Sequence, residues 1–204
     1  MPTTGSSISV IAFPHEWKNA EILEGLRNGD PSAGKAFFDR FAHRVNRLVW
    51  RLLGADSEHD DIVQEVFANA FSCIGQVRDP EHLDGWVVGV TVNTVRRELR
   101  RRRFRRMFFV FGLEDEPPSR ELSPERQALA HQFYELLGRF HPEERIVFIL
   151  CMVEGMSQPE AARACGISLS TCKRRLGRAI QRLSHLSSEW PAGQAVLDGG
   201  GEEP

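Results

Sequence analysis

Apolar residues along most of this chain recur every three or four positions, which is the spacing of an amphipathic α-helix. The longest series spans residues 37–52 and is followed by Gly54, a typical helix stop. A second series spans residues 62–74 and follows several acidic residues, which suit the positive end of a helix dipole. A shorter series at 22–26 ends in the turn sequence of residues 28–31. Because no stretch carries a β-hairpin signal, the pattern predicts an all-α fold.

One segment of the pattern is ambiguous. Residues 86–92 are rich in valine and threonine, and propensity alone would favour a β-strand there. A single strand among helices would have no partner, so we predict a weak helix that is buried by tertiary contacts. This helix would continue directly into the arginine-rich run of residues 96–106.

The helical pattern breaks between residues 112 and 124, where the chain is acidic, contains three prolines and lacks apolar periodicity. We therefore predict two small helical domains joined by a flexible acidic linker. Ser123-Pro124 is expected to begin the second domain. The apolar run 107–111 is expected to pack on the first domain, the alternative being an interaction patch. The predicted boundaries are a disordered tail at 1–15, a first domain at 16–111, a linker at 112–122, a second domain at 123–186 and a disordered tail at 187–204.

The second domain is predicted to end in a helix-turn-helix, within residues 154–183. Ser157 and Glu160 have the spacing of a capping box. Gly166 is placed to end the first helix, and Ser168 to cap the second. Small or apolar residues form the expected buried side: Ala161, Ala162, Cys165, Ile167, Cys172, Leu176, Ala179, Ile180 and Leu183. Basic residues form the other side: Lys173, Arg174, Arg175, Arg178 and Arg182. This is the shape that enters a DNA major groove, the alternative being a helical hairpin with a solvated basic face.

The net charge of −2 conceals two basic islands in an otherwise acidic chain. Residues 96–106 contain eight arginines and one glutamate, and residues 156–185 contain six basic residues and one acid. By contrast, residues 1–95 and 107–155 each carry a net charge of −5. Two separate basic surfaces indicate two contacts with a polyanion, whose strength should fall steeply with salt.

Composition argues against several other classes of protein. No run approaches the ~20 apolar residues of a membrane span, and the first residues lack the pattern of a secretory signal. We therefore expect a cytoplasmic protein without membrane insertion. The four cysteines form no CxxC pair and no zinc-finger spacing with histidine, so we expect neither a metal nor a cofactor. Cys165 and Cys172 fall on apolar helix positions, where a thiol acts as a small hydrophobe.

Two motifs resemble a known family. Residues 60–67 read DDIVQEVF, and residues 142–179 contain PEER, VEGMS, GIS and RLGRA in that order. The first is similar to the D-[LIV]-V-Q-E-x-F signature in the second conserved region of bacterial RNA polymerase sigma factors. The second follows the fourth region of the same proteins. With the acidic linker between them, residues 20–185 resemble the extracytoplasmic-function (ECF) subfamily of the sigma-70 family.

This resemblance implies protein partners. On a helix that starts near Asp60, the side chains of Asp61, Gln64 and Glu65 share a side opposite the apolar positions. In a random protein this would be a solvated face. In the family it docks the clamp helices of the largest subunit of core RNA polymerase, a role that extends to Asp60 and Asn69. The resemblance also implies contact with the polymerase flap and control by an anti-sigma factor.

The resemblance implies DNA contacts as well. The residues expected at the −10 promoter element are Arg96, Arg97, Arg100, Arg101 and Arg103. The residues expected at the −35 element are Ser170, Thr171, Lys173, Arg174, Arg175 and Arg178. Loop 76–84 lies where the family captures a base flipped from the melted strand. Trp86 is either a stacking surface or a core residue. The family usually has arginine and alanine where this chain has Gly89, Thr91 and Val92, so contacts to the melted strand should differ there.

The resulting hypothesis is a promoter-specificity subunit that binds core RNA polymerase, recognises the −10 and −35 elements and initiates transcription. It is not expected to be an enzyme, because the sequence offers no nucleophile–base pair, phosphate-binding loop or metal cluster. The first alternative is a stand-alone helix-turn-helix regulator of transcription. The second is a nucleic-acid enzyme, which would show metal-dependent turnover.

Overall fold

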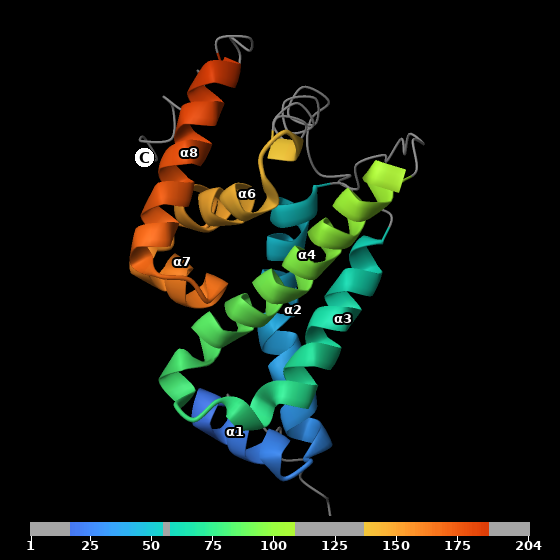
Figure 1. Cartoon of the computed structure of the whole chain (residues 1–204). Helices are drawn as coiled ribbons and strands as arrows, with labels where there is room; N and C mark the ends of the chain where they lie inside the picture. The colour runs from blue at the N-terminus through green and yellow to red at the C-terminus, as the bar shows by residue number, and fades with distance from the viewer. Residues whose placement is uncertain (1–16, 55–57, 109–136, 188–204) are drawn as a thin grey trace, which may run out of the picture.

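The computed structural model describes residues 17–54, 58–108 and 137–187 (Figure 1). Within these ranges the regular secondary structure is helical throughout, which confirms the predicted all-α fold. The helices form an N-terminal unit, residues 17–108, and a C-terminal unit, residues 137–187.

The N-terminal unit consists of α1 (Asn19–Arg27), α2 (Pro31–Leu53), α3 (His59–Cys73) and α4 (Leu83–Phe108), with the 3₁₀ turns Ile74–Gln76 and Pro80–His82 between α3 and α4. Local signals set the ends of α2. The Asp30 carboxylate accepts a hydrogen bond from the Ser32 amide at 2.8 Å, with Pro31 in the first turn. Gly54, with a φ of +83°, ends the helix as predicted.

The ambiguous valine-rich segment is helical and forms the first half of α4. Val87, Val88 and Val92 are at most 2% exposed between neighbouring helices, and Trp86 and Val90 are half-buried. The Thr91 hydroxyl is also buried, and it donates to the Val87 carbonyl at 2.9 Å. Tertiary burial therefore overrides the local preference of these residues for a strand, as predicted.

The C-terminal unit consists of α6 (Pro142–Phe148), a π-helical turn (Ile149–Val153), α7 (Gln158–Cys165) and α8 (Leu169–Ser187). α6 begins at Pro142, and His141 is its N-cap residue. The π-helical turn was not predicted, because its apolar residues also fit an ordinary helix. In Figure 1, α6 and α7 lie between α8 and the helices of the N-terminal unit.

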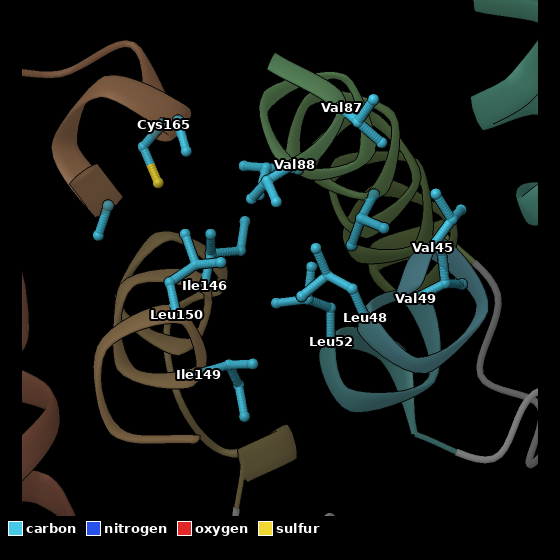
Figure 2. Close-up of a cluster of buried hydrophobic side chains, with 14 of the residues drawn as sticks. Val45, Leu48, Val49, Leu52, Val87, Val88, Ile146, Ile149, Leu150 and Cys165 are labelled. Atoms are coloured by element: carbon cyan, nitrogen blue, oxygen red, sulfur yellow. The ribbon is translucent and has the colours of Figure 1, made fainter. Parts of the chain in front are cut away.

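A single hydrophobic core runs through both units. Figure 2 shows Leu48 and Leu52 of α2 facing Ile146, Ile149 and Leu150 of the C-terminal unit. All five side chains are at most 1% exposed. The two units are therefore packed against each other, an arrangement that the sequence did not predict. Each set of apolar residues could equally be interpreted as the core of its own domain.

Several predicted features lie outside the described residues. These are the tail at 1–15, the side chains of the apolar run at 107–111, the linker at 112–122, the helix start at Ser123-Pro124 and the tail beyond residue 187.

Candidate nucleic-acid and partner interfaces

The helix-turn-helix is built from the local signals that the sequence carries. The Glu160 amide donates to the Ser157 hydroxyl at 3.4 Å, and the Ser157 amide donates to the Glu160 carboxylate at 2.9 Å. This capping box starts α7 as predicted. Hydrogen bonds from the Ser157 side chain and amide hold the pKa of the Glu160 carboxyl below its usual range. Gly166 ends α7 in the left-handed conformation, with a φ of +63°, and Ser168 accepts a hydrogen bond from the Thr171 amide at 3.2 Å to cap α8.

α8 has one buried and one basic side. The apolar stripe Cys172, Leu176, Ala179 and Leu183 is buried. Ile180 lies one position off this stripe and is 44% exposed, so its predicted burial is wrong. The predicted −35 residues Ser170, Lys173, Arg174 and Arg178 are exposed, whereas Thr171 and Arg175 are half-buried.

The predicted −10 residues lie on α4 and differ in accessibility. The Arg96 side chain is only 13% exposed, and its Nε lies 3.0 Å from the Glu143 carboxylate. Its Nη2 donates to the Cys165 carbonyl at 3.1 Å. Arg97 and Arg100 are 62% and 71% exposed, and they remain accessible to a ligand.

Two further arginines of α4 surround a buried carboxylate. The Glu98 side chain is 6% exposed and lies 2.7 Å from Arg101 Nε and 2.8 Å from Arg102 Nε. Burial alone would raise the pKa of Glu98, but hydrogen bonds from Arg102 and Arg101 lower it below its usual range. Arg101 is still 52% exposed. Arg103 is also a predicted −10 residue, and its side chain lies outside the described part of the structure.

Glu143 is a site residue that the sequence analysis missed. Its carboxylate is 13% exposed and lies 2.8 Å from Arg175 Nη1 of α8. It also contacts Arg96 at 3.0 Å and Arg100 at 3.4 Å, both on α4. One carboxylate thus joins three of the predicted DNA-binding arginines. Its position in the first turn of α6 indicated only a helix-dipole role, because its partners are distant in the sequence.

The predicted polymerase-binding residues lie on α3. Asp60, Asp61, Gln64 and Glu65 are exposed on the side opposite the buried apolar positions. Asn69 is half-buried, and its amide donates to the Thr94 hydroxyl of α4 at 3.1 Å. The structure therefore gives Asn69 a packing contact within the N-terminal unit.

A cavity of about 870 Å³ lies between α4, the loop at 74–84 and α7. Its lining includes Gln76 of the loop, Trp86 and Asn93 of α4, and Arg163 of α7. Trp86 is half-buried: part of its side chain packs against the hydrophobic core, and part lines the cavity. The cavity adjoins the loop for which the resemblance implied a base pocket.

The cysteines of the C-terminal unit act as small apolar residues. Burial raises the pKa of both the Cys151 and Cys165 thiols to about 11, and it also raises that of Cys172. In the described part of the chain, no group of three or more histidine, cysteine or acidic residues is placed to hold a metal ion. The helices of this part are also too short or too polar to cross a membrane.

Family comparisons match both units. Residues 37–105 match the sigma-70 region 2 family, and residues 130–183 match the sigma-70 region 4 family. The chain is 32% identical to the ECF RNA polymerase sigma factor SigE of Mycolicibacterium smegmatis, in an alignment that covers 89% of the chain and 78% of SigE. It is 30% identical to the ECF RNA polymerase sigma factor SigM of Mycobacterium tuberculosis, with 84% and 86% covered.

Solved structures share the fold. CnrH in complex with the cytosolic domain of CnrY aligns with a TM-score of 0.60 and 23% identity, over 83% of this chain and 96% of CnrH. The sigma factor RpoE of Bartonella quintana, in complex with the anti-sigma factor NepR, also aligns with a TM-score of 0.60, at 21% identity. That alignment covers 76% of this chain and 96% of RpoE.

Proposed function

Because this chain belongs to the ECF subfamily of the sigma-70 family of RNA polymerase sigma factors, we propose that it is a promoter-recognising subunit of bacterial RNA polymerase. The observation that carries this proposal is the match to both regions in family order, residues 37–105 and then 130–183. A stand-alone regulator needs only the helix-turn-helix. The match to region 2 across α2, α3 and α4 therefore disfavours that alternative.

In this proposal α3 binds core RNA polymerase. Asp60, Asp61, Gln64 and Glu65 form an exposed acidic and amide surface on a helix whose other side is fixed in the core. Such a surface suits a basic or polar helical partner. In the family this partner is the pair of clamp helices of the largest polymerase subunit. Asn69 supports this surface by its hydrogen bond to Thr94.

The arginines of α4 hold the upstream part of the −10 element, and the part of α4 that lines the neighbouring cavity receives a base from the melted strand. Arg97, Arg100 and Arg101 are more than half exposed on one helix, so each can contact a phosphate. Trp86 and Asn93 offer the cavity an aromatic surface and an amide, the groups that stack on a base and read its edge.

α8 reads the −35 element from the major groove. Its first turns expose Ser170, Lys173 and Arg174, and the next turn exposes Arg178. An arginine bidentate to guanine contributes about 1–3 kcal/mol of discrimination. The proposal assigns no catalytic step to this chain, and it places the protein in the cytoplasm with RNA polymerase. Control by an anti-sigma factor is part of the proposal, supported by the complex that the structural relative RpoE forms with NepR.

Charge reversal on α3 tests the proposal. The double variant Asp61→Arg/Glu65→Arg should lose binding to core polymerase and promoter-dependent transcription in a reconstituted assay. The matched control is Glu24→Arg/Asp39→Arg, which makes the same charge change at exposed positions of α1 and α2. The control should retain both activities. If the wild-type chain gives no promoter-dependent transcript with core polymerase, the proposal fails; transcription that survives the Asp61/Glu65 change would refute the assignment of α3.

A further inference from the structure

The base-reading loop, residues 76–84, connects α3 to α4 and lies beside α1 (Figure 1). Under the proposed function this loop and the adjoining cavity read a base of the −10 element. A loop that adapts its shape accepts several different bases, so discrimination requires that its conformation be held before the base arrives. The contacts around the loop show which side chains hold it.

α1 is a rigid support for the loop. Its residues Ile22 and Leu23 are 1% exposed in the hydrophobic core. Gly25 packs so closely on α2 that an added Cβ would lie 2.5 Å from the Cβ of Ala33, which is itself completely buried. Because there is no room for even one methyl group between the two helices, α1 is fixed in its position on α2.

Two side chains of α1 hold the main chain of the loop. Asn19, the first residue of α1, donates from its side-chain amide to the Pro80 carbonyl at 3.1 Å. Arg27, the last residue of α1, donates from its guanidinium to the Val77 carbonyl. The loop is therefore held at two main-chain atoms by the two ends of one helix.

A third contact fixes the junction between the loop and α4. The Asp84 carboxylate accepts a hydrogen bond from the Asn19 amide at 3.3 Å and another from the Arg44 guanidinium at 3.1 Å. It thereby links α1 and α2 to the first turn of α4. Arg44 and Asp84 also line the cavity, so this network forms part of the cavity wall.

These anchors leave the loop side chains that face the cavity to another role. Gln76, Glu81 and His82 are exposed and line the cavity, whereas the two carbonyls that α1 holds belong to the main chain. The lining of the cavity contains neither Asn19 nor Arg27. The position of the loop is thus set by α1, and the groups that would meet a base come from the loop itself.

We propose that Asn19 and Arg27 are positioning residues for recognition of the −10 element. They hold the base-reading loop in the conformation that discriminates between bases, and they act without touching the DNA. The inference rests on the proposed function, because it takes the loop as a reader of promoter DNA. It extends that function to α1, which lies outside the residues that match the sigma-70 region 2 family, 37–105.

Asn19→Asp tests the proposal with a change of one atom. The new carboxylate accepts where the amide donated, so it repels both the Pro80 carbonyl and the Asp84 carboxylate. An aspartate in the first turn suits the positive end of the helix dipole, so α1 itself is not weakened. The matched control is Asn28→Asp, the same change at the exposed C-terminal end of α1, where the dipole disfavours it. A loss caused only by a weaker α1 would therefore be larger in the control.

The first measurement uses the full chain without polymerase and reports on the loop alone. Hydrogen exchange of the amides within residues 76–84 is followed by mass spectrometry. Exchange should be about fivefold faster in Asn19→Asp than in the wild type, the factor that corresponds to one lost hydrogen bond. A second variant, Arg27→Gln, removes the other anchor and should have the same effect. Asn28→Asp should exchange at the wild-type rate.

The second measurement uses the chain with core polymerase and a duplex library in which the −10 and −35 elements are randomised. Sequencing of the DNA that the holoenzyme retains gives the preference for each base at each position. In Asn19→Asp and Arg27→Gln, the preference should fall about fivefold at a position of the −10 element. The preference at the −35 element, which α8 determines, should remain that of the wild type. A general loss of stability would lower both preferences together.

The proposal requires both changes, so a wild-type exchange rate or a wild-type −10 preference in both variants would overturn it. Equal losses at the two elements, or an equal loss in Asn28→Asp, would also overturn it. Selection by the wild type tests the proposed function separately. If the wild-type holoenzyme shows no preference at either element, the proposed function fails and this inference fails with it. If the wild type and the variants select the same −10 sequences, only the positioning role of α1 is refuted.

Discussion

Replacing glycine by alanine at two positions of the helix-turn-helix should change stability in opposite directions. Gly166 adopts a φ of +63° at the end of α7, and Gly177 lies within α8 on its exposed side. An added Cβ would meet nothing within 4 Å at either position. Any difference between the two variants therefore comes from backbone conformation and not from crowding.

The magnitudes follow from the two conformations. An L-residue in the left-handed region costs roughly 1–2 kcal/mol, offset in part by the lower entropy of the unfolded alanine chain, about 0.4–1 kcal/mol. Gly166→Ala should therefore lower the free energy of unfolding by about 1 kcal/mol. Gly177→Ala should raise it by about 0.8–1 kcal/mol, the difference in helix propensity.

Urea unfolding followed by circular dichroism at 222 nm measures both changes. With an m-value of about 2 kcal/mol/M, the midpoints of the two variants should lie about 1 M apart, with the wild type between them. Equal m-values would show that the unfolded states are comparable. Shifts of the same sign in both variants would refute the reasoning, because they would show that backbone conformation at Gly166 does not determine the effect.

Three further predictions concern the core, the thiols and the cap of α7. Ile146→Ala removes a side chain that is completely buried between the units, and it should lower the free energy of unfolding by about 2–5 kcal/mol. The control Ile180→Ala, at an exposed position, should lower it by less than about 1 kcal/mol. Comparable losses in urea unfolding would contradict the shared core. Since burial raises the pKa of Cys165 to about 11, this thiol should react with a disulfide reagent at pH 8 only when the chain unfolds, and rapid labelling of the native chain at Cys165, located by mass spectrometry, would count against its burial. Because hydrogen bonds from Ser157 lower the pKa of Glu160 in the folded chain, they stabilise the fold at pH values above about 4.3, the pKa of an unfolded glutamate. This stabilisation is lost as the pH falls through the lower pKa of the folded state. Ser157→Ala should therefore flatten the dependence of unfolding on pH between about 5 and 3, and an unchanged pH profile would oppose this assignment.

Local signals made much of the fold predictable from the sequence. The capping box at Ser157 and the stops at Gly54 and Gly166 each depend on residues within three or four positions, and the structure contains all of them. The helix at 86–92 was also predictable, because a strand there would have had no partner. The family motifs indicated the two surfaces of the proposed function for the same reason: each is carried by a short contiguous segment.

The features that were not predicted depend on distant pairs. Glu143 and Arg96 are far apart in the sequence, and nothing in their own segments indicates that they meet. The packing of Ile146 against Leu48 has the same origin, because an apolar stripe shows that a helix is buried but not which neighbour buries it. Burial of Ile180 was wrongly predicted because both Ala179 and Ile180 lie at helical spacing from Leu176 and Leu183, and the sequence does not show which of them faces the core.

The hydrogen bond from Arg96 to the Cys165 carbonyl makes the contact between the units sensitive to chain length rather than to side-chain identity. The acceptor is a main-chain oxygen at the end of α7, which every amino acid would supply. Substitutions at the exposed positions of α7 can therefore accumulate during evolution while this bond persists. Deleting one residue between Ser157 and Gly166 would instead rotate the terminal carbonyl by about 100° around the helix axis and remove the acceptor from Arg96. Related chains that keep this bond should differ freely at the exposed positions of α7 but share its length.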